Sequence, residues 1–154
     1  MNINSIDHKL IRFCNKISIP FARLAIFVVF FWFGALKVVG LSPASALVQA
    51  LFETTMPIMS FSLFIVLFGV LEMVIGLLFL LPGAERAVLP VLFFHMATTF
   101  MPLVFLSSET WSGFLVPTLE GQYIIKNVLI IALAIVVASQ LRPMNWRTKF
   151  ESRS

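Results

Sequence analysis

The segment FSLFIVLFGVLEMVIGLLFLL, residues 61–81, decides the fold of this chain. Sixteen of its residues are Leu, Ile, Phe or Val, and together they favour membrane insertion by about 5–10 kcal/mol. That gain exceeds the cost of about 3 kcal/mol for burying the carboxyl of Glu72 near the middle of a membrane helix. The segment is therefore predicted to cross a bilayer with a carboxyl inside it.

The rest of the chain has the same character. Its 154 residues are 60% hydrophobic and 12% charged, with a mean hydropathy of +1.01, which excludes an ordinary soluble domain. Four apolar runs have the length of membrane helices, at residues 21–40, 58–81, 87–106 and 123–141. We predict one all-α integral membrane domain, an antiparallel bundle of four transmembrane helices that takes the lipid bilayer as its solvent.

The segments outside these runs also have recognisable patterns. Residues 1–18 place apolar residues at helical spacing, which predicts a short amphipathic helix on the inner membrane surface. Ser42-Pro43 predicts the start of a further short helix that ends near Thr55. Residues 107–122 are predicted to form a loop, and residues 142–154 a basic tail.

The sequence Ala44-Ser45-Ala46 resembles a signal-peptidase site. The apolar region before it is longer than the roughly 7–15 residues typical of a signal peptide. We therefore favour an uncleaved first span.

The basic residues follow the positive-inside rule. Apart from Lys37 and Lys126, they precede the first run or lie at its start, lie between the second and third, and follow the fourth, whereas the other two connections contain no Lys or Arg. This pattern predicts that both termini are cytoplasmic. The net charge of +4 is then explained by membrane topology, and nucleic-acid binding is not expected.

Glu72 and His95 are the leading candidates for a functional site. Helical rise places Glu72 about 13 Å and His95 about 12 Å from the cytoplasmic side, on two spans joined by a short turn. The two side chains are expected to meet directly or through a water, where a carboxyl and an imidazole could exchange a proton. A hydrogen-bonded pair that only specifies helix packing is the alternative. Thr98 and Thr99 continue the polar stripe of His95 and are candidates for ligand contact.

Lys37 and Lys126 are predicted near the outer ends of the first and fourth spans. Each side chain either extends to the lipid headgroups or forms an electropositive outer mouth for an anionic or carbonyl-bearing ligand. Trp32 and Asn127 are further candidates for ligand contact. No metal or haem site is expected, because His95 is the sole histidine within a span. Cys14 is the sole cysteine, which excludes an internal cysteine pair.

Three motifs resemble the DoxX-like superfamily, and in their order they resemble most the DUF417 (YkgB/RclC-type) proteins. They are Gly34-Ala35-Leu36-Lys37, the run Gly69–Leu78 around Glu72, and Gly121–Asn127 with its Lys126-Asn127 pair. Val38 stands where the first motif usually has Phe, and residues 97–102 depart from the DUF417 pattern. The resemblance implies a four-helix bundle in the bacterial inner membrane and a link to redox chemistry or oxidative-stress resistance, with quinone as a possible cofactor.

Three functions remain open from the sequence. The first is a redox-linked protein that binds a quinone-like or other small lipophilic molecule, with Glu72 and His95 handling protons. The second is a non-enzymatic accessory or stress-resistance protein. The third is a proton-coupled carrier of small solutes, which with four spans would act as a dimer. The partners implied are a second copy or a redox protein.

Overall fold

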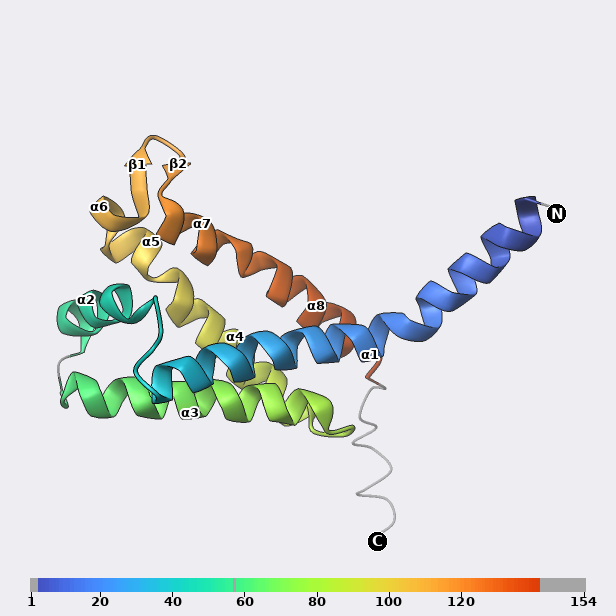
Figure 1. Ribbon diagram of the computed structural model, residues 1–154, viewed down its shortest axis with the longest axis horizontal. Helices are drawn as coiled ribbons and strands as arrows, with labels where there is room; N and C mark the ends of the chain where they lie inside the picture. Colours follow the sequence, from blue (N-terminus) through green and yellow to red (C-terminus); the bar gives the residue numbers. More distant parts are fainter. Residues whose placement is uncertain (1–2, 57, 142–154) are drawn as a thin grey trace, which may run out of the picture.

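The computed structural model describes residues 3–56 and 58–141 and is dominated by helices (Figure 1). Within these residues, four helical segments are long and apolar enough to cross a membrane: Ile6–Val38, Phe61–Leu80, Glu85–Phe105 and Leu119–Ala138. They agree with the predicted all-α architecture of four spans. The largest difference lies in the first segment, which begins well before the predicted start at residue 21.

Helix α1 (Ile3–Val38) is a single helix of 36 residues. The expected division into a separate helix over residues 1–18 and a first span is therefore wrong. Pro20 lies inside α1, where it removes one backbone hydrogen bond and favours a bend without ending the helix. Figure 1 shows that α1 bends along its length and that its N-terminal part projects beyond the other helices.

The C-terminal end of α1 is fixed by a Schellman motif. Gly40 has a positive φ of 73°, the Gly40 amide donates to the Lys37 carbonyl, and the Leu41 amide donates to the Leu36 carbonyl. A residue without Cβ adopts this left-handed conformation at little cost. The motif stops α1 sharply after Lys37 and Val38.

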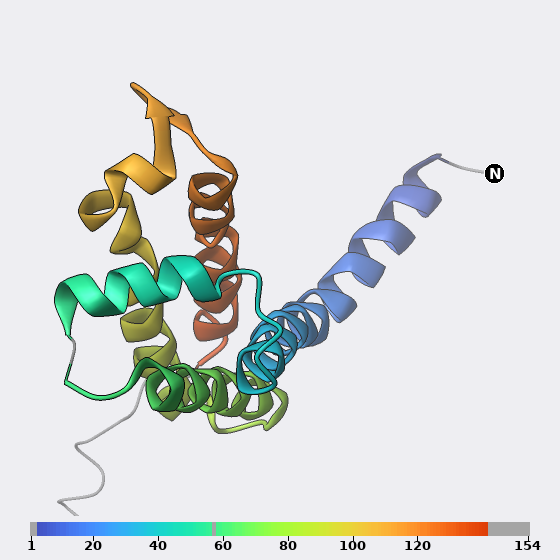
Figure 2. The ribbon, with the colours of Figure 1, turned by 60° about the vertical axis from the view of Figure 1, so that its left-hand side comes forward.

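Helix α3 (Phe61–Leu80) is the main packing partner of α1, and the two run antiparallel (Figures 1 and 2). Their backbones meet at glycines. A Cβ added to Gly34 would lie 2.5 Å from the Gly69 carbonyl oxygen, and one added to Gly76 would lie 3.0 Å from the Phe31 amide nitrogen. These glycines allow a closer approach than any side chain would permit.

Helix α2 (Ser45–Thr55) confirms the short helix predicted after Ser42-Pro43. It contacts both α3 and α5 (Pro102–Phe105), and Figure 2 shows it lying across the bundle. Its buried side chain is Phe52, whose ring stacks on Phe64 of α3 at 4.5 Å between centroids. Helix α2 therefore covers the bundle on the side where α1 ends.

Helix α4 (Glu85–Phe100) follows α3 after a tight turn. The turn contains Gly83 with φ of 94°. Arg23 of α1 forms an ion pair with Glu85 and donates a hydrogen bond of 3.4 Å to the Phe79 carbonyl. This contact ties α1 to the turn between α3 and α4.

The segment over residues 107–122, which was predicted to be a loop, consists largely of regular secondary structure. It contains α6 (Ser107–Thr110), then the antiparallel strands β1 (Trp111–Gly113) and β2 (Val116–Pro117). The indole of Trp111 donates to the Leu103 carbonyl at 2.9 Å, which fastens the hairpin to α5. The loop prediction was wrong because a two-residue strand leaves too short a pattern to recognise.

Helices α7 (Leu119–Lys126) and α8 (Val128–Ala138) form the last span. The span starts before the predicted residue 123 because Thr118 caps α7, its hydroxyl accepting from the Gly121 amide at 3.2 Å. The buried apolar core joins α1, α3, α4 and α8, and it includes Ile26, Phe79, Leu92 and Ala134.

Candidate functional site

Three titratable side chains meet inside the bundle, one from each of α1, α3 and α4. The Lys37 Nζ lies 2.5 Å from Glu72 Oε2, and the His95 Nε2 lies 3.2 Å from Glu72 Oε1. The side chains of Lys37, Glu72 and His95 are 7%, 9% and 3% exposed. We call this group the buried triad. The predicted contact between Glu72 and His95 is confirmed.

The glycine contact between α1 and α3 positions the first two members. A Cβ on Gly69 would lie 2.6 Å from the Gly34 carbonyl oxygen and 2.9 Å from the Lys37 Cβ. Gly69 and Glu72 lie three residues apart on α3, as do Gly34 and Lys37 on α1, so each pair shares a helix face. Close approach of the two backbones therefore brings the ammonium onto the carboxylate.

The environment of Lys37 differs from the sequence prediction. Lys37 lies in the last turn of α1, at the end of its span as predicted, but its side chain is buried within the bundle and does not extend to the lipid headgroups. The reason is the early end of α1: its last turn lies beside Gly69, eight residues into α3 from Phe61. At 1.5 Å per residue, α3 continues for about 12 Å beyond that level.

Aromatic rings enclose the triad. The His95 ring lies 4.8 Å from the Phe68 ring and 5.4 Å from the Phe30 ring, measured between centroids. The Lys37 Nζ lies 5.7 Å from the Phe68 centroid, within the range of a cation–π contact. Phe68 also stacks on Phe64, which itself stacks on Phe52. A continuous row of rings thus leads from α2 to His95.

The triad is balanced in charge when His95 is neutral. Removing a charge from water costs several kcal/mol, and an opposite charge in hydrogen-bond contact offsets much of that cost. Lys37 also lies in the last turn of α1, where the helix dipole favours a cation. Ionised Lys37 and Glu72 therefore stabilise one another inside the bundle.

One polar atom of the triad is unsatisfied. His95 Nδ1 is buried and has no hydrogen-bond partner among the residues that the structure describes. In a neutral imidazole whose Nε2–H donates to Glu72, Nδ1 carries the lone pair and can accept a hydrogen bond. In the protonated ring Nδ1 is a donor. A buried polar atom left unpaired costs about 1–3 kcal/mol, so Nδ1 marks where a further polar group would bind.

The other candidate residues do not provide a hydrogen-bond partner for His95 Nδ1. The hydroxyls of Thr98 and Thr99 donate to the His95 carbonyl at 2.7 and 3.0 Å, so their protons are used within α4. Lys126 is exposed, and its Nζ lies 5.0 Å from the Tyr123 centroid. Asn127 is half-buried at the junction of α7 and α8. No contact between Lys126 or Asn127 and the triad is observed in the described residues.

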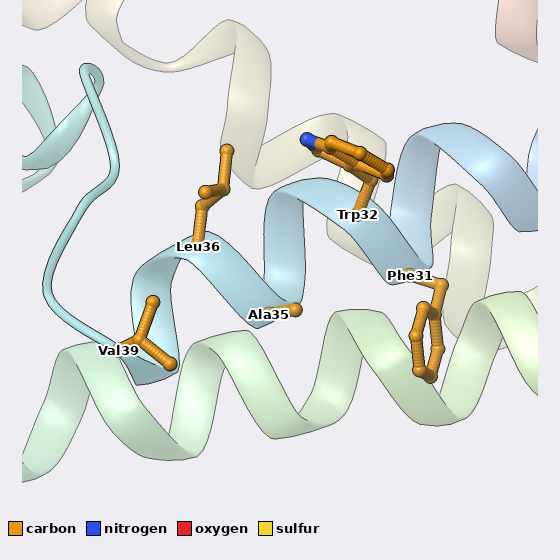
Figure 3. Close-up of a pocket in the computed structure, with 5 residues that line it drawn as sticks. All are labelled: Phe31, Trp32, Ala35, Leu36 and Val39. Atoms are coloured by element: carbon orange, nitrogen blue, oxygen red, sulfur yellow. The ribbon is translucent and has the colours of Figure 1, made fainter.

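Trp32 is also outside the triad. It is 64% exposed and helps to line an open apolar hollow of about 250 Å³ on the surface of α1, with Phe31, Ala35, Leu36 and Val39. Figure 3 shows that all five side chains come from α1. Lys37, by contrast, is buried, on the face of the helix that meets α3.

Searches of family models, curated proteins and solved structures find no match to this chain. The geometry of the site therefore carries the functional argument.

Sequence reasoning missed the pairing of Lys37 with Glu72, although a usable signal was present. Lys37 lies 14 residues after Arg23 (37 − 23), and Glu72 lies 13 residues before Glu85 (85 − 72). Once Arg23 is paired with Glu85, just beyond the end of α3, these similar offsets put the second cation close to the level of the second carboxylate.

Proposed function

We propose that this chain is a multi-pass membrane protein that binds a small lipophilic molecule with a carbonyl or hydroxyl oxygen, such as a quinone, and that His95 gives or takes the proton when a redox partner protein reduces or oxidises that molecule. The observation that carries the proposal is the buried, unpaired Nδ1 of His95. The oxygen of such a molecule would satisfy this atom, and its ring would contact the surrounding Phe side chains.

Both oxidation states of a quinone fit one imidazole. A hydroxyl donates to Nδ1 of neutral His95, whereas protonated His95 donates from Nδ1 to a carbonyl. Glu72 lies 3.2 Å from Nε2 and stabilises the imidazolium that forms when Nδ1 takes up a proton. Lys37 holds the carboxylate of Glu72 from the other side at 2.5 Å. Glu72 and His95 thus handle the proton, and Lys37 positions Glu72.

We further propose that the protein lies in the bacterial inner membrane with both termini in the cytoplasm. In this proposal it is a DoxX-like protein linked to redox chemistry or oxidative stress. The support is the order of the sequence motifs and the distribution of Lys and Arg around the four spans.

The test is binding of decylubiquinone to the purified protein in lipid nanodiscs, followed by quenching of tryptophan fluorescence. The variant His95→Phe keeps an aromatic ring between Phe30 and Phe68 but removes both nitrogens. We expect its affinity to fall about tenfold, the value of one hydrogen bond to an ionisable group. The control Lys126→Gln changes an exposed cation outside the triad and should leave the affinity unchanged. Equal quenching of the wild type and His95→Phe contradicts the proposal.

A second candidate function is a non-enzymatic accessory protein in which the triad only specifies helix packing. The observation that favours it is the low exposure of all three side chains, none above 9%. The triple variant Lys37→Met, Glu72→Leu, His95→Phe separates the two functions. An accessory role predicts that this folded variant complements a deletion strain, whereas ligand binding predicts that it does not.

A further inference from the structure

The buried triad has different surroundings on its two sides along the bundle. One side contains the turn between α3 and α4 and the N-terminal part of α1, and we call it the turn side. The other contains α2, the C-terminal end of α1 and the β1–β2 hairpin, and we call it the α2 side (Figure 1). These names follow from the arrangement of the helices and hold whichever side is cytoplasmic.

A layer of apolar side chains closes the turn side. We call it the dry layer. It is formed by residues of α1, α3, α4 and α8 that belong to one buried cluster, none of them more than 1% exposed: Ile26, Ile75, Phe79, Val88, Leu92, Ala134 and Val137. All four spans therefore contribute to a continuous apolar seal.

The dry layer contains nothing that holds water. Over residues 24–36, 73–80, 87–94 and 128–138 the four spans have no charged, hydroxyl or amide side chain. A buried water typically makes about three hydrogen bonds to polar groups, and apolar cavities stay empty. The nearest charged pair on the turn side is Arg23 with Glu85. Glu85 and His95 are ten residues apart on α4 (95 − 85), so about 15 Å of helix separates that pair from the triad.

On the α2 side, the face of α4 that enters the core becomes polar. The residues of this face follow one another in steps of four and three: Val88, Leu92, His95 and Thr99. Val88 and Leu92 belong to the dry layer, whereas Thr99 is half-buried. The Thr99 hydroxyl donates to the His95 carbonyl, and its oxygen can still accept a hydrogen bond from water.

The last span shows the same change. Ala134, Ile130 and Asn127 share one face, and Asn127 is half-buried at the start of α8. Helix α4 contacts both α7 and α8, so the Asn127 amide and the Thr99 hydroxyl both lie on the α2 side of the dry layer. Helix α1 forms no wall there, because it ends one residue after Lys37. The α2 side therefore offers polar groups to water on α4 and α8, opposite the row of Phe rings on α3.

We infer that water reaches the buried triad from the α2 side only, so that the protons His95 gives or takes are exchanged with that side of the membrane. The functional meaning of this route rests on the proposed proton transfer at His95. In the proposed orientation the α2 side is the outer one. Reduction of the bound molecule then takes up protons from outside the cell, and its oxidation releases them there.

The test compares single thiols on the core face of α4. Cys14→Ser removes the sole cysteine, and Thr99→Cys or Leu92→Cys then places a thiol four residues after or three residues before His95. Each variant in proteoliposomes meets a membrane-impermeant, positively charged methanethiosulfonate on one side at a time. The thiolate is the reactive form, and it forms where water is present rather than in lipid or a dry core.

Two marker positions establish the orientation in the vesicles. Glu53→Cys, on the exposed surface of α2, marks the α2 side, and the native Cys14, exposed on the projecting part of α1, marks the turn side. We expect Thr99→Cys to react at least tenfold faster from the α2 side than from the turn side, and Leu92→Cys to react from neither. Ala134→Cys repeats the dry-layer measurement with a smaller change of volume.

Two outcomes overturn the inference. One is reaction of Leu92→Cys or Ala134→Cys from either side, because water then enters the dry layer. The other is a Thr99→Cys thiol that does not react from the α2 side, or that reacts equally from both sides. The labelling uses protein without ligand. A failure here therefore leaves decylubiquinone binding at His95 untouched, and a failure of that binding leaves the labelling result valid.

Discussion

Helix α1 carries two cations paired with carboxylates, and the two pairs differ in what surrounds them. Arg23 is 19% exposed, contacts Glu85, and also donates to the Phe79 carbonyl beside the α3–α4 turn. Lys37 is 7% exposed and contacts Glu72, which is shared with His95. The first pair fastens the end of a turn. The second contains an additional titratable ring with an unpaired nitrogen, which is the property expected of a site.

The largest effect is expected from Glu72→Leu. The substitution leaves the Lys37 ammonium buried without its carboxylate, and breaking a buried pair from one side costs about 3–5 kcal/mol. The measurement is the midpoint of thermal unfolding of the protein in detergent. We expect a large fall in the midpoint for Glu72→Leu. An unchanged midpoint contradicts the assignment of Lys37 to this pair.

A double variant serves as the matched control for that prediction. Lys37→Met with Glu72→Leu removes both charges and replaces them with apolar side chains of similar size. Replacement of a buried ion pair in this way is often neutral or stabilising. The double variant should recover most of the lost stability but not the binding of decylubiquinone.

A smaller effect is expected from Gly69→Ala. The new Cβ would lie 2.6 Å from the Gly34 carbonyl oxygen, so α1 and α3 must separate, at a cost of about 1–3 kcal/mol. The separation also moves Lys37 from Glu72. Gly83→Ala serves as the control. The added Cβ meets open space at the turn, so this variant introduces backbone strain but no clash between helices. Tighter ligand binding by Gly69→Ala than by wild type would contradict the role of the glycine contact.

Removing the charge of Glu85, which pairs with Arg23 at the α3–α4 turn, should lower the stability less. Glu85→Gln keeps an acceptor for Arg23 but removes the negative charge, and water can reach the partly exposed guanidinium. We expect a loss of about 1 kcal/mol and no change in ligand affinity. Thermal unfolding and decylubiquinone binding measured on the same sample check both statements. A tenfold loss of affinity would show that the two pairs are functionally connected.

The smallest effect is expected from Lys126→Gln. The cation–π contact with Tyr123 is exposed and contributes at most about 1 kcal/mol. Both the unfolding midpoint and the ligand affinity should stay close to the wild-type values. A marked loss of affinity would restore the outer-mouth interpretation of Lys126.

The sequence was sufficient for the features that depend on hydrophobic length and helical rise. The four spans follow from apolar runs, and the contact between Glu72 and His95 follows from their similar depth on two spans joined by a tight turn. Both predictions use local quantities, residue counts and 1.5 Å per residue. They needed no knowledge of how the helices pack.

The errors arose where tertiary packing decides the outcome. Lys37 was placed near the surface because a span was assumed to end at the membrane boundary, whereas Gly40 ends α1 beside the middle of α3. The continuity of α1 through Pro20 was missed because the amphipathic pattern of residues 1–18 and the apolar run that follows were interpreted as two separate segments. The unpaired His95 Nδ1 was beyond sequence reasoning, since it depends on the orientation of one ring.

The pairing of Lys37 with Glu72 also has a consequence for biogenesis. A charged side chain adds to the cost of inserting its helix, by about 2.5–3.5 kcal/mol at the centre of the helix and by less near its end, and Lys37 and Glu72 are separated by 35 residues of chain. During synthesis α1 therefore enters the membrane with an uncompensated ammonium, which is neutralised when α3 arrives. Recognition between these two helices is thus a step of insertion itself, and a chain that lost Glu72 would present an unpaired charge to the quality-control machinery of the membrane.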